Sequence, residues 1–510
     1  MSIIPKMIKT SNQSLKKILE AYKEISLLTQ VSSVLSWDQN TYMPPMGADN
    51  RAAQLTILQE IITNKWNDAE LKSLIEQIDD RKLNAVEEAA MRNIRRTTKF
   101  YFNVPKNVIL KNTEVTSKAF SIWQEARAKN DFKAFAPILT EIFALKKEIA
   151  GFLGYKKNPY DALLDLYEPG LDSKECEQVF TQLQPKITTL LKRIVSSKEY
   201  KKPNPFMAKT WHYPEAEQKK LSDFIMKKMT YSMDEGRLDI SAHPFTTELG
   251  RNDIRITTRY HEDDVRSAYA ATIHEAGHGL YELGIDEEYS HSPFAGGVSL
   301  GIHESQSRFW ENQVGRSREF LHYMSPVFST LFADVFGNAT EHDLVKYVNH
   351  VKPGLIRIES DEVTYNLHII LRFEIENAMM NNKFSVKEIP DVWNQKMKKY
   401  LGIVPDVDSQ GCMQDVHWSY GDVGYFPTYC LGTMFAAQYG ERMRKSLKVD
   451  ALVSRGELAP IREWLRKQIH VHGSRFTPQE VIMKVTGEPL NPKYFVDYLE
   501  RKYSAIYDLT

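Results

Sequence analysis

The sequence predicts a large, mainly α-helical protein, and three features of the 510-residue chain support this prediction. Runs of alternating polar and apolar residues, which indicate half-buried strands, are few. No Ser/Gly/Pro-rich linker or internal repeat divides the chain, so we expect one domain over residues 1–510. Apolar residues instead recur at helical spacing over long stretches, at residues 15–30, 84–99, 132–153, 176–194 and 363–380.

A boundary between two lobes is indicated at residues 201–214, where proline and basic residues concentrate. We expect a helical roof over residues 1–205 and a floor over residues 206–510, with a deep groove between them. The same segment could also be a surface loop of an undivided body.

A helix is predicted over residues 263–283, because apolar residues recur at helical spacing, acidic residues stand at the start and Gly284 follows the end. It contains the string HEAGH at residues 274–278, which is the H-E-x-x-H pattern of metallopeptidases. Residues four apart share one helix face, so both histidines can reach one metal ion while Glu275 is turned partly aside. The interior glycines cost about 1 kcal/mol each, which indicates that a strand or a second helix approaches the backbone there.

A catalytic zinc site needs a third protein ligand, and two histidines with one glutamate are a recurring set. Glu304 is the best candidate, because it follows a glycine-rich loop and opens a second predicted helix that could face the first. Glu282, Glu287 and Glu288 are rivals, and their ordinary interpretation is that of solvated surface acids. Glu282 also continues the face of the two histidines without folding back on the metal.

The predicted chemistry is metal-assisted hydrolysis of a peptide bond. A bound zinc polarises the scissile carbonyl and lowers the pKa of a water from about 15.7 to about 7, and Glu275 accepts the proton as general base. We expect one divalent metal per chain, with zinc as the first choice and cobalt as an alternative that the ligand types allow. Asp361 or another nearby acid would fix the orientation of a metal-bound imidazole, and His303 and His368 are expected to pack nearby rather than to bind the metal.

The motifs together resemble the thermostable carboxypeptidase family, whose first-named member is carboxypeptidase Taq. HEAGH is followed by HESQ at residues 303–306, and the resemblance extends over nearly the whole chain. Ser360 stands where alanine is more usual in the family. The other matching strings are HPF at 243–245, DIRIT at 253–257, LIRIESDEVTYNLHI at 355–369, SWDQ at 36–39, NPYD at 158–161, EPG at 168–170 and QDVHWS at 414–419 with GYFPTY at 424–429.

This resemblance implies a helical, two-lobed fold with a substrate groove, related to neurolysin and angiotensin-converting enzyme. It also implies that His417, Tyr425 and Tyr429 lie where related helical zinc peptidases place the donors that stabilise the transition state. Loss of one such donor costs about 10²–10³ in rate. The sequence does not decide which tyrosine points inward.

Removal of single C-terminal residues requires a cation that holds the free carboxylate, and the planar fork of arginine suits this task. Arg255 and Arg357 are the candidates. Residues 253–258 alternate as a short strand, so Arg255 is expected at the edge of a small sheet near the metal. In the resembled family, the HPF motif with His243 and the DxRxT motif with Arg255 close one end of the groove, which would explain trimming rather than internal cleavage.

Three functions are compatible with these residues. The first is a metallocarboxypeptidase of broad specificity, the second an endo-oligopeptidase on the same scaffold, and the third an inactive peptide-binding or structural zinc protein. The intact HEAGH motif and Glu304 argue against the third. An amidated peptide separates the first two, because a carboxypeptidase should leave it intact.

The charge and cysteine content narrow the possible partners. Sixty-six basic and 66 acidic residues balance, so no global field favours nucleic acid or an anionic membrane. The three cysteines, Cys176, Cys412 and Cys430, lack metal-like spacing and suggest buried thiols in a reducing compartment. With neither a signal peptide nor an apolar membrane span, the chain is expected in the cytoplasm. Peptides are the expected substrates, and the family resemblance implies a homodimer.

Overall fold

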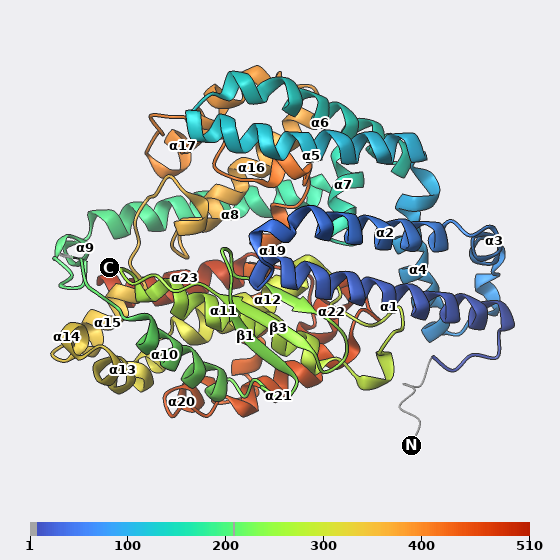
Figure 1. Ribbon diagram of the computed structural model, residues 1–510. Helices are drawn as coiled ribbons and strands as arrows, with labels where there is room; N and C mark the ends of the chain where they lie inside the picture. The colour runs from blue at the N-terminus through green and yellow to red at the C-terminus, as the bar shows by residue number, and fades with distance from the viewer. Residues whose placement is uncertain (1–7, 208–209, 510) are drawn as a thin grey trace.

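Helices dominate the computed structural model, which describes residues 8–207 and 210–509, and this confirms the predicted mainly α fold (Figure 1). Residues 208–209 of the expected boundary segment lie outside the described ranges. All the regular secondary structure described in residues 8–207 is helical. Its helices are α1 (Gln13–Thr41), α2 (Ala48–Trp66), α3 (Ala69–Gln77), α4 (Ala85–Asn103), α5 (Lys106–Lys129), α6 (Phe132–Leu153), α7 (Pro159–Tyr167), α8 (Ser173–Ser196) and α9 (Lys198–Lys201).

The part of the chain from residue 210 onward carries the sheet and the motif-bearing helices. It opens with α10 (Glu215–Lys228), β1 (Gly236–Ile240), β2 (Thr246–Glu248), β3 (Ile254–Thr258), α11 (Val265–Gly284), α12 (Leu300–Arg308) and the π-helical segment η4 (Phe309–Gly315). It continues with α13 (Arg318–Leu331), α14 (Ala333–Phe336), α15 (Glu341–Val348), α16 (Tyr365–Met380), α17 (Ile389–Leu401) and α18 (His417–Tyr420). It ends with α19 (Pro427–Arg444), α20 (Val449–Val453), α21 (Ala459–Gln468), α22 (Pro478–Thr486) and α23 (Lys493–Tyr507).

The sheet is small and lies against α11, as expected from the alternating residues (Figure 1). Its strand order is β1-β3-β2; β1 runs parallel to β3, and β2 runs antiparallel to it with Thr246 opposite Ile256. Ile254 and Ile256 of β3 are buried, whereas the side chain of Arg255 between them is partly exposed. The strand order leaves β2 as an edge strand, and β2 contacts the motif-bearing helix α11.

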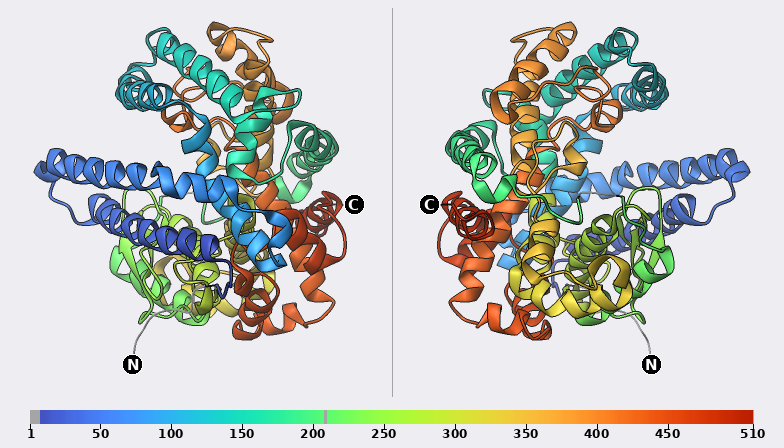
Figure 2. Two further views of the ribbon diagram at one scale, coloured as in Figure 1. Left: turned by 90° about the vertical axis from the view of Figure 1, so that its right-hand side faces the viewer. Right: turned by 90° about the vertical axis from the view of Figure 1, so that its left-hand side faces the viewer.

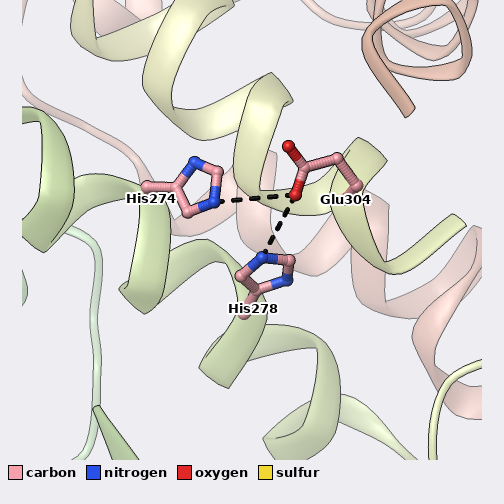
Figure 3. A group of neighbouring side chains, drawn as sticks. All are labelled: His274, His278 and Glu304. Atoms are coloured by element: carbon pink, nitrogen blue, oxygen red, sulfur yellow. Dashed lines mark ion pairs between the residues drawn. The ribbon is translucent and has the colours of Figure 1, made fainter. Parts of the chain in front are cut away.

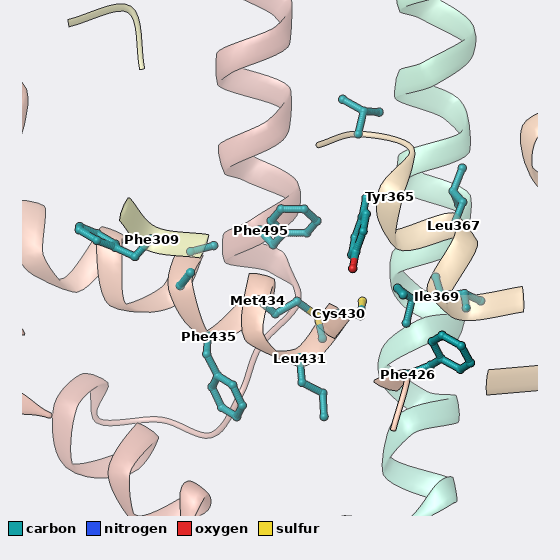
Figure 4. Packing of buried hydrophobic residues seen from close by; sticks show 14 of the residues in the cluster. Phe309, Tyr365, Leu367, Ile369, Phe426, Cys430, Leu431, Met434, Phe435 and Phe495 are labelled. Atoms are coloured by element: carbon teal, nitrogen blue, oxygen red, sulfur yellow. The ribbon is translucent and has the colours of Figure 1, made fainter. Parts of the chain in front are cut away.

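The main hydrophobic core crosses the expected boundary between the lobes. It includes residues from Val104 to Tyr507 and therefore joins helices from both halves of the chain. Figure 4 shows part of it, where Leu431 and Met434 of α19 lie near Ile369 of α16 and Phe495 of α23. The division into residues 1–205 and 206–510, and the single domain over residues 1–510, stay predictions.

The first four helices have a second, smaller core of their own, in which Leu15, Trp66, Leu71 and Ile94 are buried together. Figure 2 shows α1 and α2, in blue, projecting from the rest of the molecule. None of the helices in residues 8–207 and 210–509 combines the length and apolarity that crossing a bilayer would require.

Candidate metal centre and active site

The helix α11 places the two motif histidines on one face. Its first turn is capped by Asp264, whose side chain accepts a hydrogen bond from the backbone N–H of Arg266. His274 and His278 are one turn apart, and their ring centroids lie 4.9 Å from each other. Figure 3 shows both rings turned toward Glu304 of α12. The predicted helix and the facing second helix are therefore both present.

Close contacts between helices bring Glu304 to the histidines. A Cβ at Gly277 of α11 would lie 2.8 Å from Ser307 Cα of α12, and one at Gly432 of α19 would lie 2.6 Å from Glu304 Cβ. Only glycine permits these distances, which explains the otherwise unfavourable glycine inside α11. The carboxylate-bearing helix is thus held between two helices at backbone contact.

The three predicted ligands form a compact donor group. Glu304 Oε2 lies 3.6 Å from His274 Nε2 and 3.4 Å from His278 Nε2, and the ligand atoms all fall within 4.8 Å of one another (Figure 3). Ligands of a tetrahedral zinc at about 2.0–2.2 Å are separated by roughly 3.3–3.6 Å. The donor set and its spacing therefore fit such an ion.

The outward-facing nitrogen of His274 is held by a carboxylate network. His274 Nδ1 lies 2.8 Å from Glu311 Oε2 of η4. Glu311 in turn accepts hydrogen bonds from Arg308 Nη1 at 3.1 Å and Arg316 Nη2 at 2.6 Å. Arg308 Nε also donates to Glu304 Oε1 at 2.6 Å. One guanidinium thus fixes both the ligand carboxylate and the partner of a ligand histidine.

His278 has a different partner. Its Nδ1 lies 2.6 Å from His303 Nδ1, and His303 Nε2 lies 2.7 Å from Glu282 Oε1. The consistent assignment of protons has His278 donating to His303 and His303 donating to Glu282, because the carboxylate can only accept. This leaves His278 Nε2 with its lone pair toward Glu304 and the metal position.

The electrostatics distinguish the two motif glutamates. Burial by itself would raise the pKa of Glu304, but Arg308 and His274 outweigh it and hold that pKa well below its usual range. Burial raises the pKa of Glu275, against the lowering effects of His274 and of Thr246, whose hydroxyl donates to Glu275 Oε2 at 2.7 Å. Glu304 is therefore a permanent anion suited to a cation, whereas Glu275 is suited to proton exchange.

The rival acids lie outside this donor group. Glu282 is hydrogen bonded to His303, while Glu287 and Glu288 are exposed on the short 3-10 helix Glu287–Tyr289. Asp361 was expected as a possible partner of a ligand histidine, but its carboxylate accepts from the backbone N–H groups of residues 352, 363 and 364. Glu311 has that place instead.

The predicted donors lie together on residues 415–429, hereafter the aromatic segment. His417 Nε2 is 3.4 Å from Tyr429 Oη, and the ring centroids of Tyr425 and Tyr429 are 5.3 Å apart. Burial lowers the pKa of His417 to about 4, so its imidazole is neutral at pH 7. Burial, followed by the negative charge of Glu304, raises the pKa of Tyr425 to about 12, so the electrostatic field of the predicted ligand carboxylate reaches this phenol.

Arg357 lies at the junction between the metal ligands and the aromatic segment. Its guanidinium forms an ion pair with Asp415 at 2.9 Å and donates to Tyr365 Oη at 3.0 Å. The face of Tyr365 is covered by Arg308, with 4.6 Å between the guanidinium carbon and the ring centroid. Asp415 also pairs with the fully buried Arg372. Arg357 is therefore connected to Glu304 through Tyr365 and Arg308.

Arg255 and His243 lie in a different environment. Arg255 forms a bidentate pair with Asp253 at 2.7 and 2.8 Å, and its guanidinium carbon stacks 4.4 Å from the ring centroid of Trp37 in α1. His243 is exposed in the turn before β2, where its carbonyl accepts from Ser241 Oγ. Arg255 is thus joined to α1, His243 lies in the turn between β1 and β2, and Arg357 is connected to the predicted metal ligands.

Several residues of this centre are absent from the sequence prediction. Glu311 and Arg308 contact the predicted metal ligands, and Thr246 contacts Glu275. Glu311 and Arg308 follow Glu304 at a spacing of seven and four residues, so extending the second helix beyond the HESQ string would have indicated their shared face.

The helical fold, the edge strand beside α11 and the His-His-Glu donor group define a helical metallopeptidase. The chain belongs to the Carboxypeptidase Taq (M32) metallopeptidase family, whose model matches residues 17–503. Carboxypeptidase 1 of Bacillus subtilis is 40% identical over 499 residues, which covers 96% of this chain and 98% of the relative.

Solved structures agree with this assignment. The carboxypeptidase of Pyrococcus furiosus, in a structure named Apo-Mg, superposes with a TM-score of 0.93 at 40% identity and covers 97% of this chain and 99% of its own. Metallocarboxypeptidase 1 of Trypanosoma cruzi superposes with a TM-score of 0.92 at 35% identity, covering 96% and 99%. The expected family and fold are confirmed, and the protein is a metal-dependent peptide hydrolase that removes C-terminal amino acids.

Proposed function

We propose that His274, His278 and Glu304 hold the divalent metal of this carboxypeptidase, with zinc as the first choice and cobalt as the alternative. The observation that carries the proposal is that Glu304 Oε2 lies 3.6 Å from His274 Nε2 and 3.4 Å from His278 Nε2, while the Nδ1 atom of each histidine already has a hydrogen-bond partner. Nitrogen and carboxylate ligands in this number suit both metals. When bound, such a metal polarises the scissile carbonyl and acidifies a water.

Glu275 is proposed as the general base. Its carboxylate is 6% exposed, and Thr246 holds one of its oxygens. The other oxygen is then free to take a proton from the attacking water and to deliver it to the leaving amine. Burial raises its pKa above that of an ordinary glutamate, which makes this carboxylate a stronger proton acceptor.

His417, Tyr425 and Tyr429 are proposed as donors to the oxyanion of the tetrahedral intermediate. The neutral imidazole of His417 can donate one N–H, and the phenol of Tyr425 stays protonated with a pKa of about 12. Donors that keep their protons and are fixed before the reaction stabilise developing charge most effectively. The contacts of Tyr425 with both His417 and Tyr429 favour a shared donor group.

Arg357 is proposed to hold the C-terminal carboxylate of the peptide, with Arg255 and His243 forming the far wall of the groove. Asp415 engages part of the Arg357 guanidinium and orients it, while the same group retains further N–H bonds. Asp253 engages two nitrogens of Arg255 in the same way and orients that guanidinium along the sheet. Broad acceptance of C-terminal side chains is part of the proposal.

The test is time-resolved mass spectrometry of a peptide ladder, with metal content measured on the same sample. Stepwise loss of single residues from a free C-terminus is expected, and the C-terminally amidated peptide should stay intact. Glu275→Gln should keep its metal but lower kcat by about 10²–10⁴-fold. Internal cuts in the amidated peptide would favour the endo-oligopeptidase, and a metal-loaded Glu275→Gln variant with normal kcat would refute the assigned base.

Assembly, location and the division of the chain are further parts of this proposal. We propose a homodimer with one metal in each chain, residence in the cytoplasm, and action as one domain with lobes 1–205 and 206–510. Sedimentation equilibrium tests the dimer: a single species with the mass of one chain at micromolar concentration would contradict it.

A further inference from the structure

A buried glutamate on α16 collects three hydrogen bonds from separate parts of the chain. Glu376 is completely buried, and it accepts from Tyr160 Oη at 2.6 Å, Trp418 Nε1 at 2.7 Å and the backbone N–H of Gly424 at 2.9 Å. Two of these donors, Trp418 and Gly424, belong to the aromatic segment. Burial raises the pKa of Glu376 to about 7, while the three donors act in the opposite direction.

Helix α16 also contacts the aromatic segment through a residue one turn before Glu376. Arg372 stands four residues before Glu376, on the same helix face, and forms an ion pair with Asp415 at 2.5 Å. Asp415 and Gly424 are therefore both tied to α16, and His417 lies between them. Gly424 has a φ of +99°, and a Cβ there would lie 3.0 Å from the backbone of Leu163 in α7.

The hydrogen bonds of His417 itself are weak by comparison. Its contact with Tyr429 is long, at 3.4 Å, and its ring otherwise packs on Phe426 with 4.5 Å between ring centroids. A donor held this loosely depends on the backbone that carries it. An error of about 1 Å in the position of a catalytic group can cost about 10²-fold in rate.

We infer that Glu376 is a positioning residue, which holds the aromatic segment against α16 so that His417 and Tyr425 meet the reaction centre. This inference rests on the donor role given to His417 and Tyr425 in the proposed function. The hydrogen bonds of Glu376 go to Tyr160, Trp418 and Gly424, and none of these is a proposed metal ligand. Its removal should therefore impair turnover without loss of metal.

The primary test compares Glu376→Gln with Glu374→Gln in the metal-loaded enzyme. Glu374 is a matched control, because it is a carboxylate on the same helix that bonds Lys396 and Tyr400 of α17 instead of the aromatic segment. Glu376→Gln should lower kcat by about 10–100-fold, with KM and bound metal changing less than about threefold. A merely structural role would lower thermal stability and leave kcat per bound metal unchanged, which would overturn the inference.

A double-mutant cycle separates this inference from the proposed function. If Glu376 acts through His417, then Glu376→Gln should cost much less in kcat in the His417→Ala background than in the wild type. Equal costs in the two backgrounds would contradict the inference. A normal kcat for His417→Ala would instead refute the donor role itself. If Glu376→Gln does not fold, Tyr160→Phe is the substitute, because it removes one hydrogen-bond donor to Glu376 and no charge. A several-fold loss of kcat at constant KM is then expected. An unchanged kcat would overturn the positioning role of Glu376.

Discussion

Two regions of the centre are built in different ways. The metal side consists of His274, His278 and Glu304, which come from 31 consecutive residues of α11, α12 and their connection. The aromatic side consists of His417, Tyr425 and Tyr429. Each metal ligand has a direct, short hydrogen bond to a fixed neighbour, between 2.6 and 2.8 Å. On the aromatic side, the functional groups meet at 3.4 Å, and the short bonds belong to the backbone and to neighbours such as Asp415.

The difference shows two ways to hold a functional side chain: by hydrogen bonds to the side chain itself, or by bonds to the backbone and neighbouring residues that carry it. The metal side resembles the first case, since short hydrogen bonds hold the ligand groups themselves, and those of His274 and Glu304 have a charged partner. The aromatic side resembles the second, since its donors retain freedom to tighten on a substrate. Damage to the metal side should therefore remove the metal, and damage to the aromatic side should slow a metal-loaded enzyme.

The largest effect is expected from Glu304→Ala, which removes a proposed ligand and one of the two carboxylates that pair with Arg308. The protein should lose its metal and fall to the activity of the chelated wild type. Elemental analysis together with a peptide-hydrolysis assay tests this. Glu287→Ala changes an exposed acid near the same helices and should behave as the wild type. A fully active, metal-loaded Glu304→Ala variant would contradict the metal side as defined.

The next effect is a pH-dependent loss of stability in Asp415→Asn, which leaves Arg357 and Arg372 without their shared carboxylate. Breaking a buried pair in this way costs about 3–5 kcal/mol of unfolding free energy at neutral pH. Burial would raise the pKa of Asp415, but Arg357 and Arg372 outweigh it and depress the pKa below its unfolded value of about 3.9.

Because the folded pKa is depressed, the contribution of Asp415 is complete above the unfolded pKa and is lost as the pH falls toward the folded one. Chemical denaturation should show a constant difference between wild type and Asp415→Asn from pH 7 to about 5, narrowing below about pH 4. Asp450→Asn, at an exposed surface pair, should change stability by less than about 1 kcal/mol. A difference that grows in acid would contradict the sign.

His417→Ala should lower kcat by about 10²–10³-fold while the metal remains bound. Tyr425→Phe and Tyr429→Phe then identify which phenol shares the task, since the inward donor should show the larger loss. Steady-state kinetics on the metal-loaded variants tests this. Tyr420→Phe is the control, because Tyr420 is exposed and stacks on Phe120. Loss of metal from His417→Ala would contradict the comparison, because it would mean that the aromatic side also holds the metal.

The smallest effect is expected from Glu311→Gln, which keeps the shape of the partner of His274 but removes its charge. Metal affinity should fall by about 10–100-fold, while kcat at saturating metal changes little. Competition with a chelator measures the affinity. Glu288→Gln, an exposed change, should leave the affinity unaltered. A large fall in kcat at full occupancy would mean that Glu311 acts on the reaction as well as on the ligand.

The sequence predicted the metal side more completely than the aromatic side. The spacing of His274 and His278, the end of α11 at Gly284 and the strand that carries Arg255 all follow local periodicity, which the structure reproduces. Gly277 was correctly interpreted as a point of close approach, since the backbone of α12 lies there. These features depend on neighbours in the chain.

What the sequence could not predict depends on contacts across long separations. Thr246 meets Glu275 only because β2 is an edge strand on α11, and Glu376 meets Trp418 only because α16 runs beside the aromatic segment. Arg255 was expected beside the substrate carboxylate, and its stacking on Trp37 could not be deduced from an isolated strand. Tertiary packing, rather than propensity, decides these partners.

The glycine contacts at Gly277 and Gly432 have a consequence for protein engineering. They mean that the distance from the two imidazoles to the carboxylate is set by how closely three main chains approach, rather than by side-chain choice. A designer who transplanted only the three ligands onto another scaffold would obtain helix axes about 8–10 Å apart. At that separation, the three side chains would not reach the same arrangement around a metal. The transferable unit is the trio of interlocked backbones from α11, α12 and α19.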